Sequence, residues 1–109
     1  MQAEAYLKQV KKIDAIIARK NQESEQLKAV GINANFESEI AELWEKRKSI
    51  IATIQSLPLE EYNVLWELYV NREDRQLKEL PDIFNRSYRW AKETKKRALE
   101  HLQIILDNK

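Results

Sequence analysis

The chain contains almost none of the residues that interrupt regular backbone structure. One glycine, Gly31, and two prolines, Pro58 and Pro81, occur in 109 residues. Short strands joined by tight turns need such residues at every turn, whereas long helices need them only near their ends. The sequence therefore predicts an all-α protein made of long helices.

Residues 1–56, together with Leu57 at their end, carry two apolar stripes with the spacing of packed helices. Both stripes alternate steps of three and four residues, which keeps their members on one helix face. The first helix is expected to end near Gly31, where a left-handed backbone closes the C-terminus. Because the stripes match in length, an antiparallel helical hairpin is the simplest arrangement that buries both. The stripes are Tyr6, Val10, Ile13, Ile17, Lys20, Ser24 and Leu27, and then Ile40, Leu43, Arg47, Ile50, Ile54 and Leu57.

Two cations interrupt these apolar stripes. Folding the chain back at about residues 31–36 puts Lys20 close to Arg47. Their stems are expected either to extend toward solvent or to reach carboxylates such as Glu23 or Glu45. Alternatively, this end of the hairpin is an interface whose polar residues fix the register of a dimer or of a partner.

The apolar surface of the hairpin is wider than two helices can cover. Ile16, Trp44 and Ile51 lie beside the stripes, and Arg47 lies within one of them. Something else is expected to pack on this face, either the C-terminal part of the chain or a second copy of it. These four residues are therefore a candidate face for a homodimer or a protein partner.

Residues 57–109 are expected to form three further helices. Pro58 suits the first turn of a helix that ends near Asn71. A short segment follows, in which Leu77, Leu80 and Phe84 are spaced by three and four residues. Ser87 is placed to cap a long final helix. The inner face of that helix is predicted to be Ala91, Thr94, Ala98, Leu102 and Ile105.

The final helix begins with a concentration of positive charge. Between Arg86 and Arg97 there are six basic residues and one acid, Glu93, in a chain whose net charge is only +1. A basic helix on a mildly acidic body is typical of contact with nucleic acid, although a solvated helix face has the same pattern. Two helices joined by a short turn, the second of them basic, also match a helix-turn-helix motif.

The same residues resemble a known family. The segment LPLEEYNVLWELYV from Leu57, the helix ending at Phe84 and the pattern S...A..T..RAL..L from Ser87 resemble region four of bacterial sigma factors. This resemblance covers about half of the chain. With the hairpin, the whole length is similar to the sigma-region-four-like regulators encoded by phages of Gram-positive bacteria, the ArpU and RinA type. The opening of that group, YL..V..ID..I, is matched by Tyr6, Leu7, Val10, Ile13, Asp14 and Ile17, and Trp90 also fits the group.

The resemblance implies a transcriptional regulator that binds duplex DNA, with RNA polymerase as a further expected partner. Position by position, it assigns base contacts in the major groove to Tyr88, Arg89, Lys92 and Glu93. The chemistry of these residues suits that role, because arginine can bind a guanine edge and glutamate can accept from a cytosine amine. Lys95, Lys96 and Arg97 are expected to contact phosphates, although Arg97 has an alternative in pairing with Glu93 or Glu100.

Three residues depart from the family pattern. Pro81 replaces a small residue, so the first helix of the motif is expected to be kinked or to start only near Leu80. Arg86 and Thr94 replace apolar residues. These departures motivate an alternative function, a protein-interaction adaptor whose altered helix-turn-helix does not read DNA.

Other classes of function find little support in the sequence. There is no cysteine, and the one histidine, His101, cannot supply a clustered metal site, so we assign it no role and expect no metal or cofactor. No phosphate-binding loop or nucleophile motif is present, so an enzyme is not expected. No segment has the roughly 20 apolar residues of a membrane span. We therefore expect no contact with a membrane and an intracellular location, and the resemblance to phage regulators implies the cytoplasm of a bacterial host.

Overall fold

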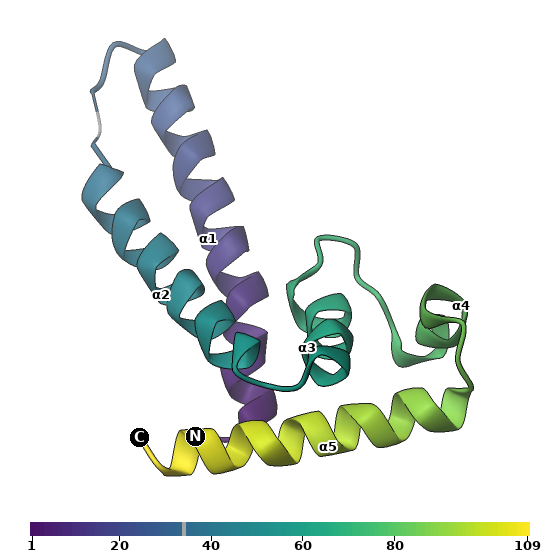
Figure 1. Ribbon diagram of the computed structural model, residues 1–109. Helices are drawn as coiled ribbons and strands as arrows, with labels where there is room; N and C mark the ends of the chain where they lie inside the picture. Colours follow the sequence, from purple (N-terminus) through teal and green to yellow (C-terminus); the bar gives the residue numbers. More distant parts are fainter. Residues whose placement is uncertain (34) are drawn as a thin grey trace.

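The computed structural model describes residues 1–33 and 35–109, and all regular structure within them is helical. This confirms the prediction of an all-α protein. Figure 1 shows two long helices that rise side by side from a base formed by the rest of the chain. The elements are α1 (Ala3–Ala29), α2 (Glu37–Gln55), α3 (Leu59–Leu65), η1 (Trp66–Val70), η2 (Leu77–Glu79), α4 (Leu80–Phe84) and α5 (Tyr88–Asp107).

Helix α1 ends at the single glycine, as its sequence predicts. Gly31 has a φ of 82°, and its N–H donates to the carbonyl of Lys28 at 3.0 Å. The N–H of Ile32 reaches back to the carbonyl of Leu27 at 2.8 Å. This pair of hydrogen bonds is the Schellman arrangement, which satisfies carbonyls that the helix end leaves unpaired. The connection to α2 includes position 34, which lies outside the described residues.

Helices α1 and α2 pack side by side and run in opposite directions (Figure 1). The two cations in their stripes are paired with carboxylates, but not with those expected. Arg47 Nε donates to Oδ1 of Asp14 at 2.8 Å, and Lys20 pairs with Glu39. Both carboxylates lie on the opposite helix from their cation, whereas the expected Glu23 and Glu45 lie on the same helix as theirs. The two ion pairs therefore join α1 to α2.

Helix α3 begins after Pro58, whose carbonyl accepts the N–H of Tyr62 at 2.9 Å. The helix continues as the π-helical turn η1 and ends at Asn71, where the sequence predicts its end. A π-turn holds one more residue than an α-turn and therefore shifts the buried face. The adjacent residues Tyr69 and Val70 of this turn are both buried.

Pro81 marks the start of a helix and not a kink within one. The 3₁₀ turn η2 leads into α4, which begins at Leu80 with Pro81 in its first turn. A proline is tolerated there because the first N–H groups of a helix have no partner within it. Of the two expectations for this segment, a start near Leu80 is therefore correct.

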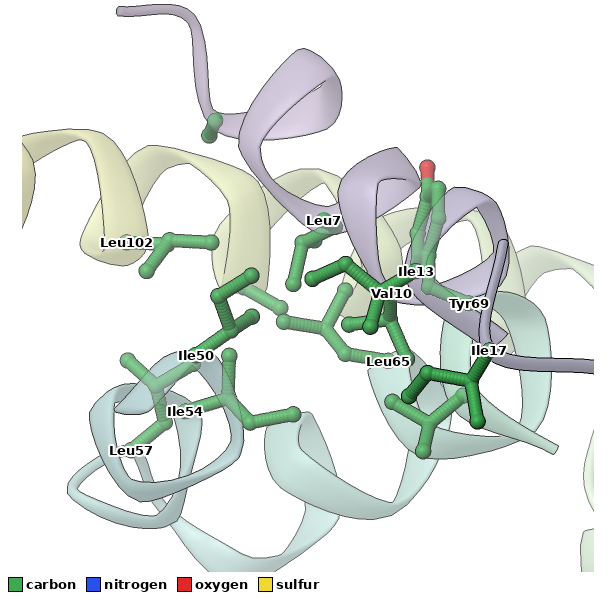
Figure 2. Packing of buried hydrophobic residues seen from close by; sticks show 13 residues of the cluster. Leu7, Val10, Ile13, Ile17, Ile50, Ile54, Leu57, Leu65, Tyr69 and Leu102 are labelled. Atoms are coloured by element: carbon green, nitrogen blue, oxygen red, sulfur yellow. The ribbon is translucent and has the colours of Figure 1, made fainter. Parts of the chain in front are cut away.

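One buried cluster joins the hairpin to the C-terminal helices. Figure 2 shows side chains of α1, α2, α3, η1 and α5 meeting in it, with Leu7, Ile54, Leu65 and Leu102 among those that are fully buried. The far ends of α1 and α2 lie beyond this cluster (Figure 1). The radius of gyration is accordingly 17.0 Å, whereas a compact chain of about 100 residues measures about 13 Å. The molecule is thus an elongated hairpin on a small helical base.

Candidate nucleic-acid interface

The turn between α4 and α5 contains three residues, Asn85, Arg86 and Ser87. Asn85 takes a left-handed conformation with a φ of 52°, and the N–H of Arg86 donates to the carbonyl of Pro81 at 3.1 Å. Asparagine tolerates this backbone region better than most residues. Ser87 Oγ accepts the N–H of Trp90 at 3.0 Å, which confirms the predicted N-cap of α5.

A second, smaller apolar cluster fixes α4 against α5. Val64, Leu80 and Ala91 form its buried centre. The rings of Phe84 and Trp90 pack beside them, with centroids 5.5 Å apart and planes inclined by 56°. Tilted aromatic pairs of this kind stabilise a contact beyond the area that they bury. The cluster therefore sets the direction in which α5 leaves the turn.

The inner face of α5 is the one predicted from its spacing. Ala91, Thr94, Ala98 and Leu102 are buried, and Ile105 is half-buried. The hydroxyl of Thr94, one of the departures from the family pattern, accepts a hydrogen bond from Arg97 Nη2 at 3.3 Å. The buried polar atom thus has a partner, and Arg97 contacts Thr94 in place of Glu93 or Glu100.

The outer face of α5 presents the basic residues to solvent. Arg89, Lys92 and Lys96 are exposed at positions i, i+3 and i+7, so they share one stripe of the helix. Tyr88 is exposed at the helix start, and Lys95 is half-buried at the edge of the face. We call Arg89, Lys92 and Lys96 the basic stripe.

Two of the expected base-contacting residues are paired with each other. Arg89 Nε lies 3.0 Å from Oε1 of Glu93, one helical turn further along. Both side chains are well exposed, at 87% and 60%. An exposed pair of this kind contributes only about 0.3–0.5 kcal/mol, so another ligand can separate it at little cost.

Arg86, the second departure from the family pattern, packs against the protein surface. Its guanidinium lies over the ring of Trp90 at 5.4 Å from the centroid, and Nη2 is 3.4 Å from Oε1 of Glu60. The arginine therefore covers Trp90 as an apolar residue would, while its charge is placed beside a carboxylate.

Sequence reasoning missed one polar contact near this face. His101 Nδ1 lies 2.6 Å from Oε1 of Glu61, and the Glu61 side chain is only 7% exposed. The sequence assigns no role to His101. The two residues are 40 positions apart, so no local spacing could reveal the contact.

Three of the four residues of the candidate partner face lie together on the hairpin, and the fourth lies apart from them. Trp44 is 47% exposed, and the guanidinium of Arg47 lies over its ring at 5.6 Å from the centroid. Trp44, Arg47 and Ile51 line one hollow on α2, whereas Ile16 of α1 does not contribute to it. The C-terminal helices therefore leave about half of Trp44 uncovered.

No three histidine, cysteine, aspartate or glutamate side chains among residues 1–33 and 35–109 are grouped so as to hold a metal ion. None of the helices formed by these residues combines the length and apolar character that a membrane span requires.

Comparisons with known proteins add no identification. The chain has no significant match among protein-family models, among curated proteins or among solved structures.

Proposed function

We propose that this chain is a transcriptional regulator of phage or prophage origin that binds duplex DNA through α5. The proposal combines the resemblance to sigma factor region four with the surface charge of α5. It places the protein in the cytoplasm of a bacterial host, with RNA polymerase as a second expected partner.

The observation that carries the proposal is the position of the basic stripe. Arg89, Lys92 and Lys96 lie on one exposed face, and the opposite face of α5 is held by α3 and α4. A helix with its side chains is about 10–12 Å across, and the major groove of DNA is about 12 Å wide. A helix held along one face with cations along the other suits insertion into that groove.

The expected contacts fall into two groups. Tyr88, Arg89, Lys92 and Glu93 lie in the first two turns of α5, where a recognition helix contacts base edges. Lys95, Lys96 and Arg97 follow and would bind phosphates, which position the protein without specifying sequence. Separation of Arg89 from Glu93 would free a guanidinium for guanine and a carboxylate for cytosine.

Fluorescence anisotropy on duplex DNA across a salt series tests the proposal. The duplexes are the region upstream of the neighbouring genes and a scrambled sequence of the same composition. Log affinity is expected to fall by about 0.9 for each phosphate contact and each tenfold rise in salt. The double variant Lys92→Ala/Lys96→Ala should bind more weakly and show a smaller slope.

A matched control replaces two exposed lysines elsewhere, Lys12→Ala/Lys46→Ala, which changes the net charge by the same amount. Under the proposal the control loses much less affinity than the basic-stripe variant. Equal losses would mean that the chain responds to total charge and that α5 is not the DNA-binding element. Absence of binding at low salt would exclude the proposal.

The second candidate is a protein-interaction adaptor that does not read DNA. It is favoured by the Arg89–Glu93 pair, which neutralises part of the basic stripe, and by the contacts that engage Arg86. Under this function, Arg89→Ala/Lys92→Ala leaves capture of purified RNA polymerase unchanged. Under the first function, the same variant loses binding to the upstream duplex.

A further inference from the structure

Helix α2 carries a second stripe beside the one that packs on α1. Its members are separated by steps of four and three residues, a 3.5-residue repeat that keeps them on one face of a helix. We call it the outer stripe, and it contains Glu37, Ala41, Trp44, Lys48, Ile51 and Gln55.

The outer stripe is largely free of contacts within the chain. Ile51 is half-buried, and the other five members are exposed. A hollow of about 460 Å³ runs along it between Trp44 and Gln55, and only side chains of α2 line that hollow. Trp44 also borders a second hollow of about 380 Å³ on the side toward Ile17 and Arg72. Trp44 thus stands as a ridge between two hollows.

We propose that the outer stripe binds the outer stripe of a second copy of this chain, with the two α2 helices antiparallel and a two-fold axis at residue 46. In antiparallel packing about this point, each residue of the outer stripe meets the outer-stripe residue that lies equally far on the other side of residue 46. Every member of the outer stripe then faces another member, because the steps of four and three read the same in both directions.

The pairs formed by this reversal complement each other in size and charge. Ala41 faces Ile51 of the second copy, so a small side chain meets a large one. Trp44 faces Lys48 of the second copy, an arrangement that permits a cation–π contact. Lys48 also lies close to Glu45 of the second copy, which provides an opposite charge.

The ends of the stripe and the flanking arginine also suit this arrangement. Glu37 faces Gln55 of the second copy, whose amide can donate to the carboxylate. Arg47 lies near the two-fold axis and would approach its own equivalent. Its charge is already balanced within each chain by Asp14 at 2.8 Å.

The parallel alternative lacks this complementarity. In a parallel pair each residue of the outer stripe would meet the same residue of the second copy. Lys48 would face Lys48 and Glu37 would face Glu37, and like charges in register destabilise a helix pair. The charge pattern therefore selects the antiparallel dimer, and this inference does not depend on DNA binding by α5.

Disulfide trapping tests the orientation, because the natural chain contains no cysteine. The variants are Glu37→Cys and Gln55→Cys, both at exposed positions. Within one helix these positions are about 27 Å apart, far beyond the reach of a disulfide. We expect a mixture of the two single variants to give a disulfide-linked dimer on oxidation, whereas each variant alone gives none. Self-linking of each single variant, or no linking in the mixture, would overturn the antiparallel arrangement.

Sedimentation equilibrium of the unmodified chain, without DNA, tests the association itself. The expected mass approaches twice the 13.0 kDa of one chain as the concentration rises. Trp44→Ala should weaken dimerisation at least tenfold, whereas Lys46→Ala, on the other side of α2, should not. A mass of 13.0 kDa for the unmodified chain over the whole concentration series would overturn the proposal.

Discussion

His101 Nδ1 and Glu61 Oε1 lie 2.6 Å apart and join the C-terminal half of α5 to the first turn of α3. The Glu61 side chain is 7% exposed, whereas that of His101 is 49% exposed. A carboxylate withdrawn from water is costly unless a hydrogen-bond donor compensates for its lost hydration. His101 therefore supplies from the surface a donor that a nearly buried acid needs.

Replacement of this donor should destabilise the fold. We expect His101→Ala to lower the free energy of unfolding by about 1–3 kcal/mol, because Glu61 then stays buried without its partner. Urea denaturation followed by circular dichroism measures the change. The loss should be smaller in a Glu61→Gln background, where no buried charge remains. Equal losses in the two backgrounds would show that the contact does not stabilise the protein.

The cap of α5 should contribute to stability in the same assay. Ser87→Ala removes the oxygen that accepts the N–H of Trp90 and should cost about 1 kcal/mol. Ser87→Asp retains an acceptor and should preserve most of the stability. Ser38→Ala, at an exposed position within α2, is the matched control and should change stability by less than about 0.5 kcal/mol. A loss in the control as large as that of Ser87→Ala would contradict the assigned role of the cap.

Substitution of Glu93 distinguishes sequence-specific contact with bases from charge attraction to phosphates. Glu93→Gln releases Arg89 from its partner and removes a negative charge from the basic stripe. Affinity for a scrambled duplex should therefore rise. If Glu93 accepts from a cytosine, preference for the native sequence should fall by about 1–3 kcal/mol. Anisotropy on both duplexes measures the two effects, with Glu100→Gln as the control. A loss of affinity for the scrambled duplex would count against DNA binding by this face.

Tyr69 should make the fold sensitive to alkaline pH. Burial of the ring raises the pKa of its phenol, and the neighbouring carboxylate of Glu4 raises that pKa further. Above about pH 10 the unfolded chain releases this proton while the folded chain retains it. The contribution of the Tyr69 phenol to stability is therefore fully present below about pH 10 and is lost as the pH rises above it. Tyr69→Phe should lose less stability between about pH 9 and 11. An unchanged alkaline loss in Tyr69→Phe would assign the effect to other groups.

The local features of the fold could be predicted because each depends on residues close together in the sequence. Gly31 ends α1, Ser87 caps α5 and Pro81 sits at the start of α4, each by backbone chemistry that a few neighbours determine. The inner face of α5 follows in the same way, since a period of 3.6 residues relates Ala91 to Leu102.

Partners of polar groups were harder to predict than apolar faces. The sequence predicts that Lys20 and Arg47 lie on the apolar stripes of the hairpin. Their partners, however, are Glu39 and Asp14, and not acids such as Glu23 or Glu45. An apolar residue is buried when it lies on the packed face of its helix, whereas an ion pair needs two charged side chains within 4 Å of each other. That distance depends on the relative position of two helices, which one-dimensional spacing does not give.

The sequence by itself determined the helical class, the positions of the helix ends and the location of the basic stripe on α5. Each of these depends on the conformational preferences of single residues or on the repeat of one helix. Only the tertiary structure decided that the hairpin and the C-terminal helices share a core, that η1 buries Tyr69 and Val70 together, and that His101 meets Glu61. These features depend on distances between segments far apart in the chain. Such distances are fixed by the simultaneous packing of all the helices, and no single stretch of sequence encodes them.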